Sequence, residues 1–160
     1  MTNLTDPTDG FKFYTDLKVR YEETDAMSVV YYGKYFIFFE VARTEYLKNI
    51  GYSYVDIEKD GFYFVVAEST CKYYNPARYD DNLRIFAKIE YMKNSSFNFL
   101  YNIIKKSENK NENSGEPDVN VNIATGNTVL VCVDNLDFRP LRIPDYLRRA
   151  IQNFEGFNYT

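Results

Sequence analysis

Asp25 is the residue whose type and position best suit chemistry. It lies in the acidic segment 22–28, directly before a helical pattern that runs from about Val30 to Ile50. A carboxylate can act as a nucleophile or as a general base, and backbone N–H groups at a helix N-terminus stabilise a negative charge that develops beside them. Asp is also favoured as a helix N-cap on capping grounds alone, and the local sequence by itself favours that structural role. Glu22 and Glu23 are expected to be solvated turn residues.

The composition narrows the possible mechanisms. The 160 residues contain no His, which excludes Ser-His-Asp and Cys-His nucleophiles and His-based zinc sites. Cys71 and Cys132 are the only cysteines, and their spacing is not that of metal ligands. We expect both to be buried, inert thiols of a protein in a reducing compartment. No metal site is predicted.

The charge and the N-terminus indicate a cytoplasmic protein. The formal net charge is -4, which argues against a nucleic-acid binder. No basic region followed by an apolar run opens the chain, so no secretory signal is predicted. The longest apolar stretches, such as Phe62 to Ala67, are far shorter than the ~20 residues that span a bilayer, so no membrane insertion is expected.

The long helical pattern after Asp25 predicts a buried helix, because its first half is apolar nearly all round. Five side chains fall at spacings of three or four and define one face: Tyr35, Phe38, Phe39, Ala42 and Tyr46. Four others lie towards the opposite side: Lys34, Arg43, Thr44 and Lys48. Gly51 follows as a C-terminal stop.

The rest of the chain predicts strands and a short terminal helix. Alternating or continuous apolar runs mark strands at 14–21, 62–74, 83–91, 97–103 and 119–133, the last broken near Gly126. Pro144 opens a helix over 145–154, and the polar stretch 105–118 is expected to be a hairpin tip. Residues 1–13 are expected to be a flexible segment and residues 14–155 a single domain. Strands in succession favour antiparallel pairing, and one apolar helix against one sheet gives an α+β fold.

Several motifs in order resemble one known family. Residues 21–35 (YEETDAMSVVYYGKY) are similar to the signature of the hotdog acyl-CoA thioesterases, in particular the 4-hydroxybenzoyl-CoA thioesterase and YbgC-like branch. The likeness continues through residues 39–47, 73–81 and 131–134, and covers roughly Leu17 to Ile151. It implies a five-stranded antiparallel sheet wrapped around one long central helix, with a short C-terminal helix. It also implies a homodimer or homotetramer whose active site lies at the dimer interface.

The same resemblance implies hydrolysis of an acyl-CoA or acyl-carrier-protein thioester. Asp25 then takes the position of the catalytic carboxylate, acting as nucleophile or general base. Tyr32 takes the position whose backbone N–H binds the thioester carbonyl oxygen. A thiolate leaves readily and needs little acid assistance, so the absence of His fits this chemistry. Coenzyme A is then part of the substrate, and no separate cofactor is expected.

Further residues are predicted to bind substrate: Ser28, Val29, Tyr31, Tyr35, Lys93, Ser95 and Ser96. Lys93, Ser95 and Ser96 fall in a turn where phosphate or amide groups of coenzyme A could bind, although a plain hairpin turn explains them equally well. Tyr31 and Tyr35 suit either an acyl pocket or the core. Ser28 stands where the family commonly has Gly, and a positive φ there would strain a serine.

Two other functions remain to be weighed against hydrolysis. A non-catalytic hotdog protein would bind an acyl thioester or a lipid without cleaving it, and turnover of acyl-CoA distinguishes the two. A hotdog dehydratase is disfavoured, because that chemistry in the family relies on a catalytic His, and this chain has none.

Overall fold

The computed structural model describes residue 6, residues 8–107 and residues 120–157. The strands are β1 (Phe13–Lys18), β2 (Phe62–Tyr73), β3 (Asn82–Met92), β4 (Ser96–Lys105) and β5 (Val121–Asp134). The helices are α1 (Lys34–Asn49), α2 (Tyr54–Lys59) and α3 (Asp145–Glu155), and a short 3-10 turn, η1, spans Tyr21–Glu23.

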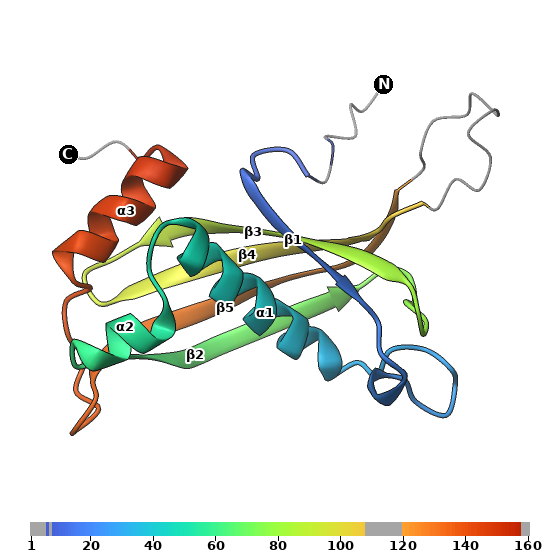
Figure 1. The fold of residues 1–160 in the computed structure, drawn as a ribbon, viewed down its shortest axis with the longest axis horizontal. Coiled ribbons are helices and arrows are strands. Elements are labelled where there is room, and N and C mark those ends of the chain that lie inside the picture. The colour runs from blue at the N-terminus through green and yellow to red at the C-terminus, as the bar shows by residue number, and fades with distance from the viewer. Residues whose placement is uncertain (1–5, 7, 108–119, 158–160) are drawn as a thin grey trace.

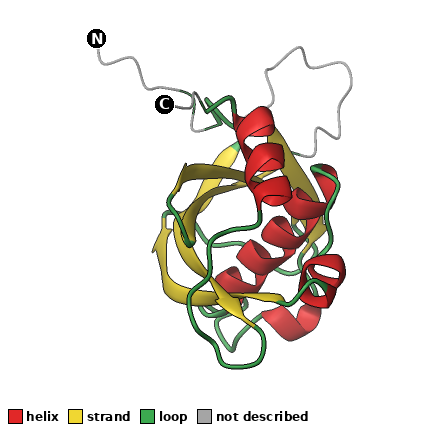
Figure 2. Cartoon of the chain, turned by 90° about the vertical axis from the view of Figure 1, so that its left-hand side faces the viewer, coloured by secondary structure: helices red, strands yellow, loops and turns green. Residues whose placement is uncertain are grey.

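The five strands form one antiparallel sheet in the order β1-β3-β4-β5-β2. The long helix α1 lies across one face of this sheet (Figure 1). Seen from the side, the strands form a curved layer with the helices gathered on one side of it (Figure 2). This arrangement confirms the predicted α+β fold, with a curved antiparallel sheet around one central helix.

The aromatic face of α1 is buried as its spacing predicts. All five residues of that face belong to the core, and the Phe39 ring stacks on Tyr101 of β4 at 4.3 Å between centroids. The expectation that the first half of the helix is buried all round is wrong for the single chain. Ile37 is 43% exposed and Val41 is 38% exposed, because only one face of α1 meets the sheet.

The C-terminal helix is fixed to α1 and to the sheet by one carboxylate. The Tyr46 hydroxyl donates to Glu155 Oε1 at 2.5 Å, and the Ile89 N–H donates to the same oxygen at 2.9 Å. Burial, followed by the hydrogen bond to Glu155, raises the pKa of Tyr46. These contacts join the C-terminal half of α1 to β3 and α3.

Several element boundaries differ from the sequence-based expectation. The long helix begins at Lys34 rather than near Val30, and β5 runs unbroken through Gly126. The short helix α2, which was not predicted from the sequence, lies between α1 and β2, and Ser53 caps it by accepting the Asp56 N–H at 3.2 Å. Of the predicted N-terminal segment, residues 1–5 and 7 lie outside the described residues, and Phe13 already belongs to β1. Most of the predicted hairpin tip, from residue 108, also lies outside them.

Within the described part of the chain, no helix is long and apolar enough to cross a membrane.

Candidate active site

Asp25 opens a minimal β-hairpin. Its N–H donates to the Val29 carbonyl at 2.9 Å, its carbonyl accepts the Ser28 N–H at 2.9 Å, and Thr24 pairs with Val30 as an isolated bridge. The Asp25 Oδ1 atom accepts the Met27 N–H at 2.8 Å. Asp is favoured at the start of such a turn because its side chain reaches the backbone two residues on. The loop therefore fixes the orientation of its own carboxylate.

This geometry excludes the helix-cap role that the local sequence favoured for Asp25. The N-cap of α1 is Gly33, which has no side chain to cap the helix. Asp25 is half-buried, and its Oδ2 atom accepts no hydrogen bond from the residues that the structure describes. One carboxylate oxygen is thus held in place while the other remains available for a reaction.

Ser28 occupies the strained position of the hairpin loop. Its φ is 61°, in the left-handed region that favours glycine. The backbone at Ser28 therefore has the positive φ that would suit the family's glycine, and this conformation costs the serine roughly 1 kcal/mol. The Arg78 Nη1 atom donates to the Ser28 carbonyl at 3.3 Å, which ties the loop to the turn before β3.

The residues before α1 present free backbone donors. Tyr31 N–H donates to the Glu23 carbonyl at 2.9 Å and Lys34 N–H to the Tyr31 carbonyl at 2.9 Å. Between them, the N–H groups of Tyr32 and Gly33 find no acceptor among the described residues. The Tyr32 carbonyl accepts the Tyr73 hydroxyl at 2.8 Å, which holds this peptide against β2. Free N–H groups at a helix N-terminus form a site for an oxyanion.

A pocket of about 290 Å³ lies beside these donors. It brings together the predicted residues Tyr32 and Tyr35, and its full lining is Val30, Tyr32, Tyr35, Tyr73, Tyr74, Asn75 and Pro76. Tyr35 also belongs to the core, since it is buried against Phe38 and contacts the Tyr73 ring at 5.1 Å. Burial raises the pKa of Tyr35. The Tyr35 side chain is therefore both a core residue and a wall of this pocket.

The other predicted residues of the loop lie next to this pocket without lining it. The Tyr31 and Tyr32 rings are 4.7 Å apart. The pKa of the Tyr31 hydroxyl is raised, first by its hydrogen bond with the Tyr32 side chain and last by the negative charge of Asp25. Val29 contributes its carbonyl to the hairpin.

One chain does not bring Lys93, Ser95 and Ser96 to the Asp25 hairpin. They follow the far end of β3, whereas the hairpin follows Lys18, which pairs with Asn82 at the near end. The 11 residues of β3 separate the two ends by roughly 35 Å. The Lys93 N–H donates to the Ser96 carbonyl at 2.7 Å, as in an ordinary hairpin turn, and the Ser95 carbonyl accepts the Cys132 N–H of β5 at 2.7 Å.

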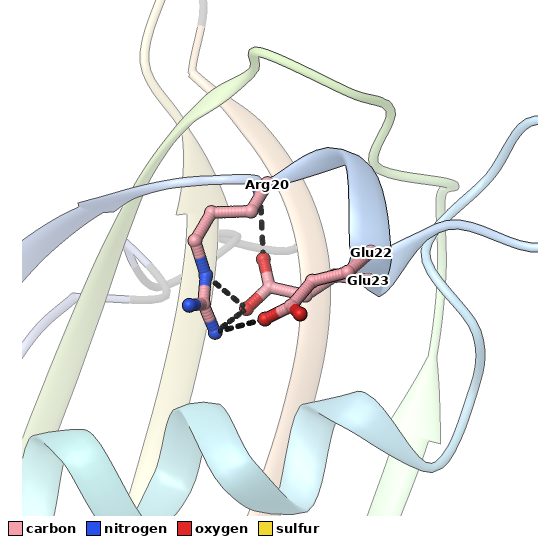
Figure 3. Close-up of polar contacts among 3 residues, drawn as sticks. All are labelled: Arg20, Glu22 and Glu23. Carbon is pink, nitrogen blue, oxygen red and sulfur yellow. Dashed lines mark hydrogen bonds and ion pairs between the residues drawn. The ribbon is translucent and has the colours of Figure 1, made fainter.

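Glu23 is not the solvated turn residue that the sequence suggested. It is 4% exposed and is bound to Arg20, whereas Glu22 in the same turn is exposed (Figure 3). Its carboxylate accepts the Arg20 backbone N–H at 2.8 Å, which is one half of a capping box around η1, while the Glu23 N–H donates to the Arg20 backbone carbonyl at 3.0 Å. The spacing of three residues between Arg20 and Glu23 is the one signal in the sequence for this pair.

Arg43 is likewise buried, at 8% exposed, although its helical position suggested the outer side. Its Nη1 atom donates to the Tyr101 hydroxyl at 3.2 Å and to Thr128 Oγ1 at 3.4 Å. It lines a second pocket, of about 490 Å³, between α1, α2 and β2. A long, flexible side chain can reach inwards from a position that a helical pattern places outside.

No group of three or more His, Cys, Asp or Glu side chains within the described residues could hold a metal ion.

Comparison with known proteins identifies the family. A model of the thioesterase-like superfamily matches residues 19–151. The acyl-CoA thioester hydrolase YbgC of Escherichia coli O6:H1 is 36% identical over 132 residues, which are 82% of this chain and 90% of that protein. A solved DHNA-CoA thioesterase from Staphylococcus aureus is 30% identical with a TM-score of 0.72, covering 91% of this chain and 95% of that chain. The chain therefore belongs to the thioesterase-like superfamily and has the hotdog fold.

Proposed function

We propose that this protein hydrolyses an acyl-CoA or acyl-carrier-protein thioester to the free acid and thiol. The names of its relatives support a thioester substrate: one is an acyl-CoA thioester hydrolase and another a DHNA-CoA thioesterase. The observation that carries the proposal is that, among the residues that the structure describes, the Asp25 Oδ2 atom and the N–H groups of Tyr32 and Gly33, all in the segment before α1, have no hydrogen-bond partner. A carboxylate and an oxyanion site are what hydrolysis of a thioester requires when no His is present.

The proposed reaction uses these groups in order. The thioester carbonyl oxygen accepts the Tyr32 N–H, and the dipole of α1 stabilises the negative charge that develops there. Loss of one such donor typically costs about 3 kcal/mol of barrier. The Asp25 carboxylate attacks the carbonyl carbon as a nucleophile or removes a proton from an attacking water. As a nucleophile, Asp25 forms a mixed anhydride while the C–S bond breaks, and water then hydrolyses the anhydride to the free acid and the Asp25 carboxylate. As a general base, it takes the proton of the water that attacks the carbonyl, and the C–S bond then breaks. In both routes the thiolate leaves and takes up a proton.

We further propose that two copies of the chain form the working enzyme by pairing their β2 strands. β2 is 12 residues long and lies at the edge of the sheet, with Val66 55% exposed. Unpaired strand edges of this length invite a further strand. In antiparallel pairing across a twofold axis, the β2 strand of the second copy would run in the opposite direction to that of the first. Its β3–β4 turn, with Lys93, Ser95 and Ser96, would then lie towards the first copy's Asp25 hairpin.

The dimer predicts a mass in solution near twice the 18.9 kDa of the chain, by analytical ultracentrifugation. Val66→Lys places a charge on the paired edge and is expected to shift the protein towards monomer and to lower its activity. Val121→Lys, at a strand position of β5 that is 38% exposed, is the control and should leave the mass unchanged. A wild-type protein that sediments as a monomer and is fully active would contradict this assembly.

Thiol release from a panel of short, medium, long and aromatic acyl-CoAs tests the proposed activity. We expect turnover of at least one class, at rates of order 1 s⁻¹ or more, in the range typical of enzymes. The class with the highest kcat/KM then identifies the acyl group. Tight binding of acyl-CoA without thiol release would instead favour the non-catalytic hotdog protein.

A further inference from the structure

The buried Glu23 carboxylate contacts Arg20 at three points. Glu23 Oε2 accepts the Arg20 backbone N–H at 2.8 Å, and Oε1 accepts the Arg20 Nε at 3.2 Å and Nη2 at 3.1 Å (Figure 3). Burying a carboxylate is costly unless it is paired and hydrogen-bonded in this way. Glu22 also pairs with Arg20, at 2.9 Å, but its side chain is 64% exposed. The Glu23 charge is therefore buried, although the exposed carboxylate of the neighbouring Glu22 could pair with Arg20 without being buried.

The turn is also closed by hydrogen bonds that do not involve the Glu23 side chain. Backbone hydrogen bonds close η1, from the Glu23 N–H to the Arg20 carbonyl at 3.0 Å and from the Thr24 N–H to the Tyr21 carbonyl at 3.1 Å. The Thr24 hydroxyl adds a further bond to the Tyr21 carbonyl at 2.7 Å. Residues of many types at position 23 would leave these bonds in place. What the Glu23 side chain adds is a fixed orientation of the peptide that leads into the hairpin.

Glu23 is also the point at which the two halves of the candidate site meet. Its backbone carbonyl accepts the Tyr31 N–H, and the Thr24–Val30 bridge lies directly beyond that bond. Asp25 follows Glu23 by two residues, and Tyr32 follows Tyr31 by one. A displacement of Glu23 would therefore move both the carboxylate and the oxyanion donor.

We propose that Glu23, held by Arg20, is a positioning residue that fixes the Asp25 carboxylate relative to the Tyr32 N–H. This inference rests on the proposed thioesterase function. Reacting groups must be held close to their productive geometry, and a displacement of about 1 Å can cost 10²-fold in rate. The Arg20–Glu23 pair provides this rigidity from outside the residues that would touch substrate.

Glu23→Gln tests the role with little change of shape. The amide oxygen can still accept the Arg20 N–H, but the charged contact with the guanidinium is lost. We expect kcat to fall about 10-fold or more, with KM within about 3-fold, because the loss is one of alignment rather than of substrate binding. Glu22→Gln, the same substitution in the same turn, should leave kcat within about 2-fold. Arg20→Gln, at an exposed side chain, should lower kcat in the same direction as Glu23→Gln.

A double-mutant cycle separates positioning from general structural damage. In an Asp25→Asn background, Glu23→Gln should have a much smaller effect on the residual rate, because the carboxylate that it aligns is gone. Full additivity of the two effects would overturn the proposal. So would a Glu23→Gln enzyme that is less stable but has unchanged kcat. If Glu23→Gln fails to fold, Arg20→Gln carries the same test, and unchanged kcat in that variant would overturn the proposal. If the wild type hydrolyses no thioester, the proposed function fails, and not this inference alone.

Discussion

Asp25→Asn is expected to lower kcat for thioester hydrolysis by about 10³-fold while leaving the protein folded. An amide can neither attack a carbonyl as this carboxylate would nor remove a proton from water, and general-base or nucleophilic assistance typically contributes about 10²- to 10⁴-fold. The hairpin should survive, because the Asn Oδ1 can still accept the Met27 N–H that Asp25 accepts at 2.8 Å. Thiol release and thermal unfolding, measured on the same preparations, check both halves of this expectation.

The chain contains a matched control for this substitution. Asp137 is exposed, and its Oδ1 accepts the Arg139 N–H at 3.1 Å, the same two-residue contact that Asp25 makes with Met27. Asp137→Asn therefore repeats the chemical change in the same kind of turn, in the loop after β5 and away from the Asp25 hairpin of the same chain. It should leave kcat unchanged. Equal rates for wild type and Asp25→Asn would mean that Asp25 only shapes its turn.

The elements of the fold that the sequence predicts best are those with a strict period. The aromatic residues of α1 recur every three or four positions, and the aliphatic residues of β3 alternate with polar or larger ones, so both the type and the buried face of these elements could be predicted. The strand order could not, because alternation identifies a face and not a neighbour. β2 pairs with β5 and not with β3, which follows it in the chain.

Predictions of single side chains failed where a specific partner overrides the pattern. Glu23 looks like a turn residue until Arg20 is seen to hold it, and Arg43 looks solvent-facing until its contacts with Tyr101 and Thr128 are seen. The start of α1 was misplaced because residues 24–30 form a hairpin of their own. A hairpin this short has no apolar alternation by which the sequence could reveal it.

The candidate site could be predicted only through the resemblance to the hotdog thioesterases. Local propensity favoured a helix cap for Asp25, and the structure shows instead a side chain that caps its own turn. Tyr32 is predicted to act through its backbone N–H, a group that every residue except proline carries, so residue type alone does not single it out. Its free N–H is a property of the path of the chain before α1.

Gly126→Ala is expected to destabilise the fold by about 3 kcal/mol or more. A Cβ at this position would lie 2.5 Å from the Phe39 Cε2 and Cζ atoms and 2.5 Å from the Thr70 carbonyl oxygen. The Phe39 ring cannot simply turn away, because it is fully buried and stacked on Tyr101 with an interplanar angle of 8°. Overpacking a tight core typically costs about 1–3 kcal/mol, and here a backbone carbonyl also blocks relief. Denaturant unfolding of both proteins measures the difference.

Two comparisons separate this close approach from a general effect of replacing glycine in the chain. Gly33→Ala should cost less than about 1 kcal/mol, because its φ of -69° suits any residue and the nearest atom belongs to the exposed side chain of Tyr31.

Phe39→Leu in the Gly126→Ala protein should recover part of the lost stability, and no recovery would mean that the contact with Thr70 dominates. Phe39 lies in α1, and the Tyr32 N–H lies two residues before the first residue of α1. If Gly126→Ala displaces α1 from the sheet, it should therefore also displace this donor and lower kcat. The absence of a side chain at Gly126 thus allows α1 to pack close to the sheet, and we expect this packing to fix the position of the candidate oxyanion site.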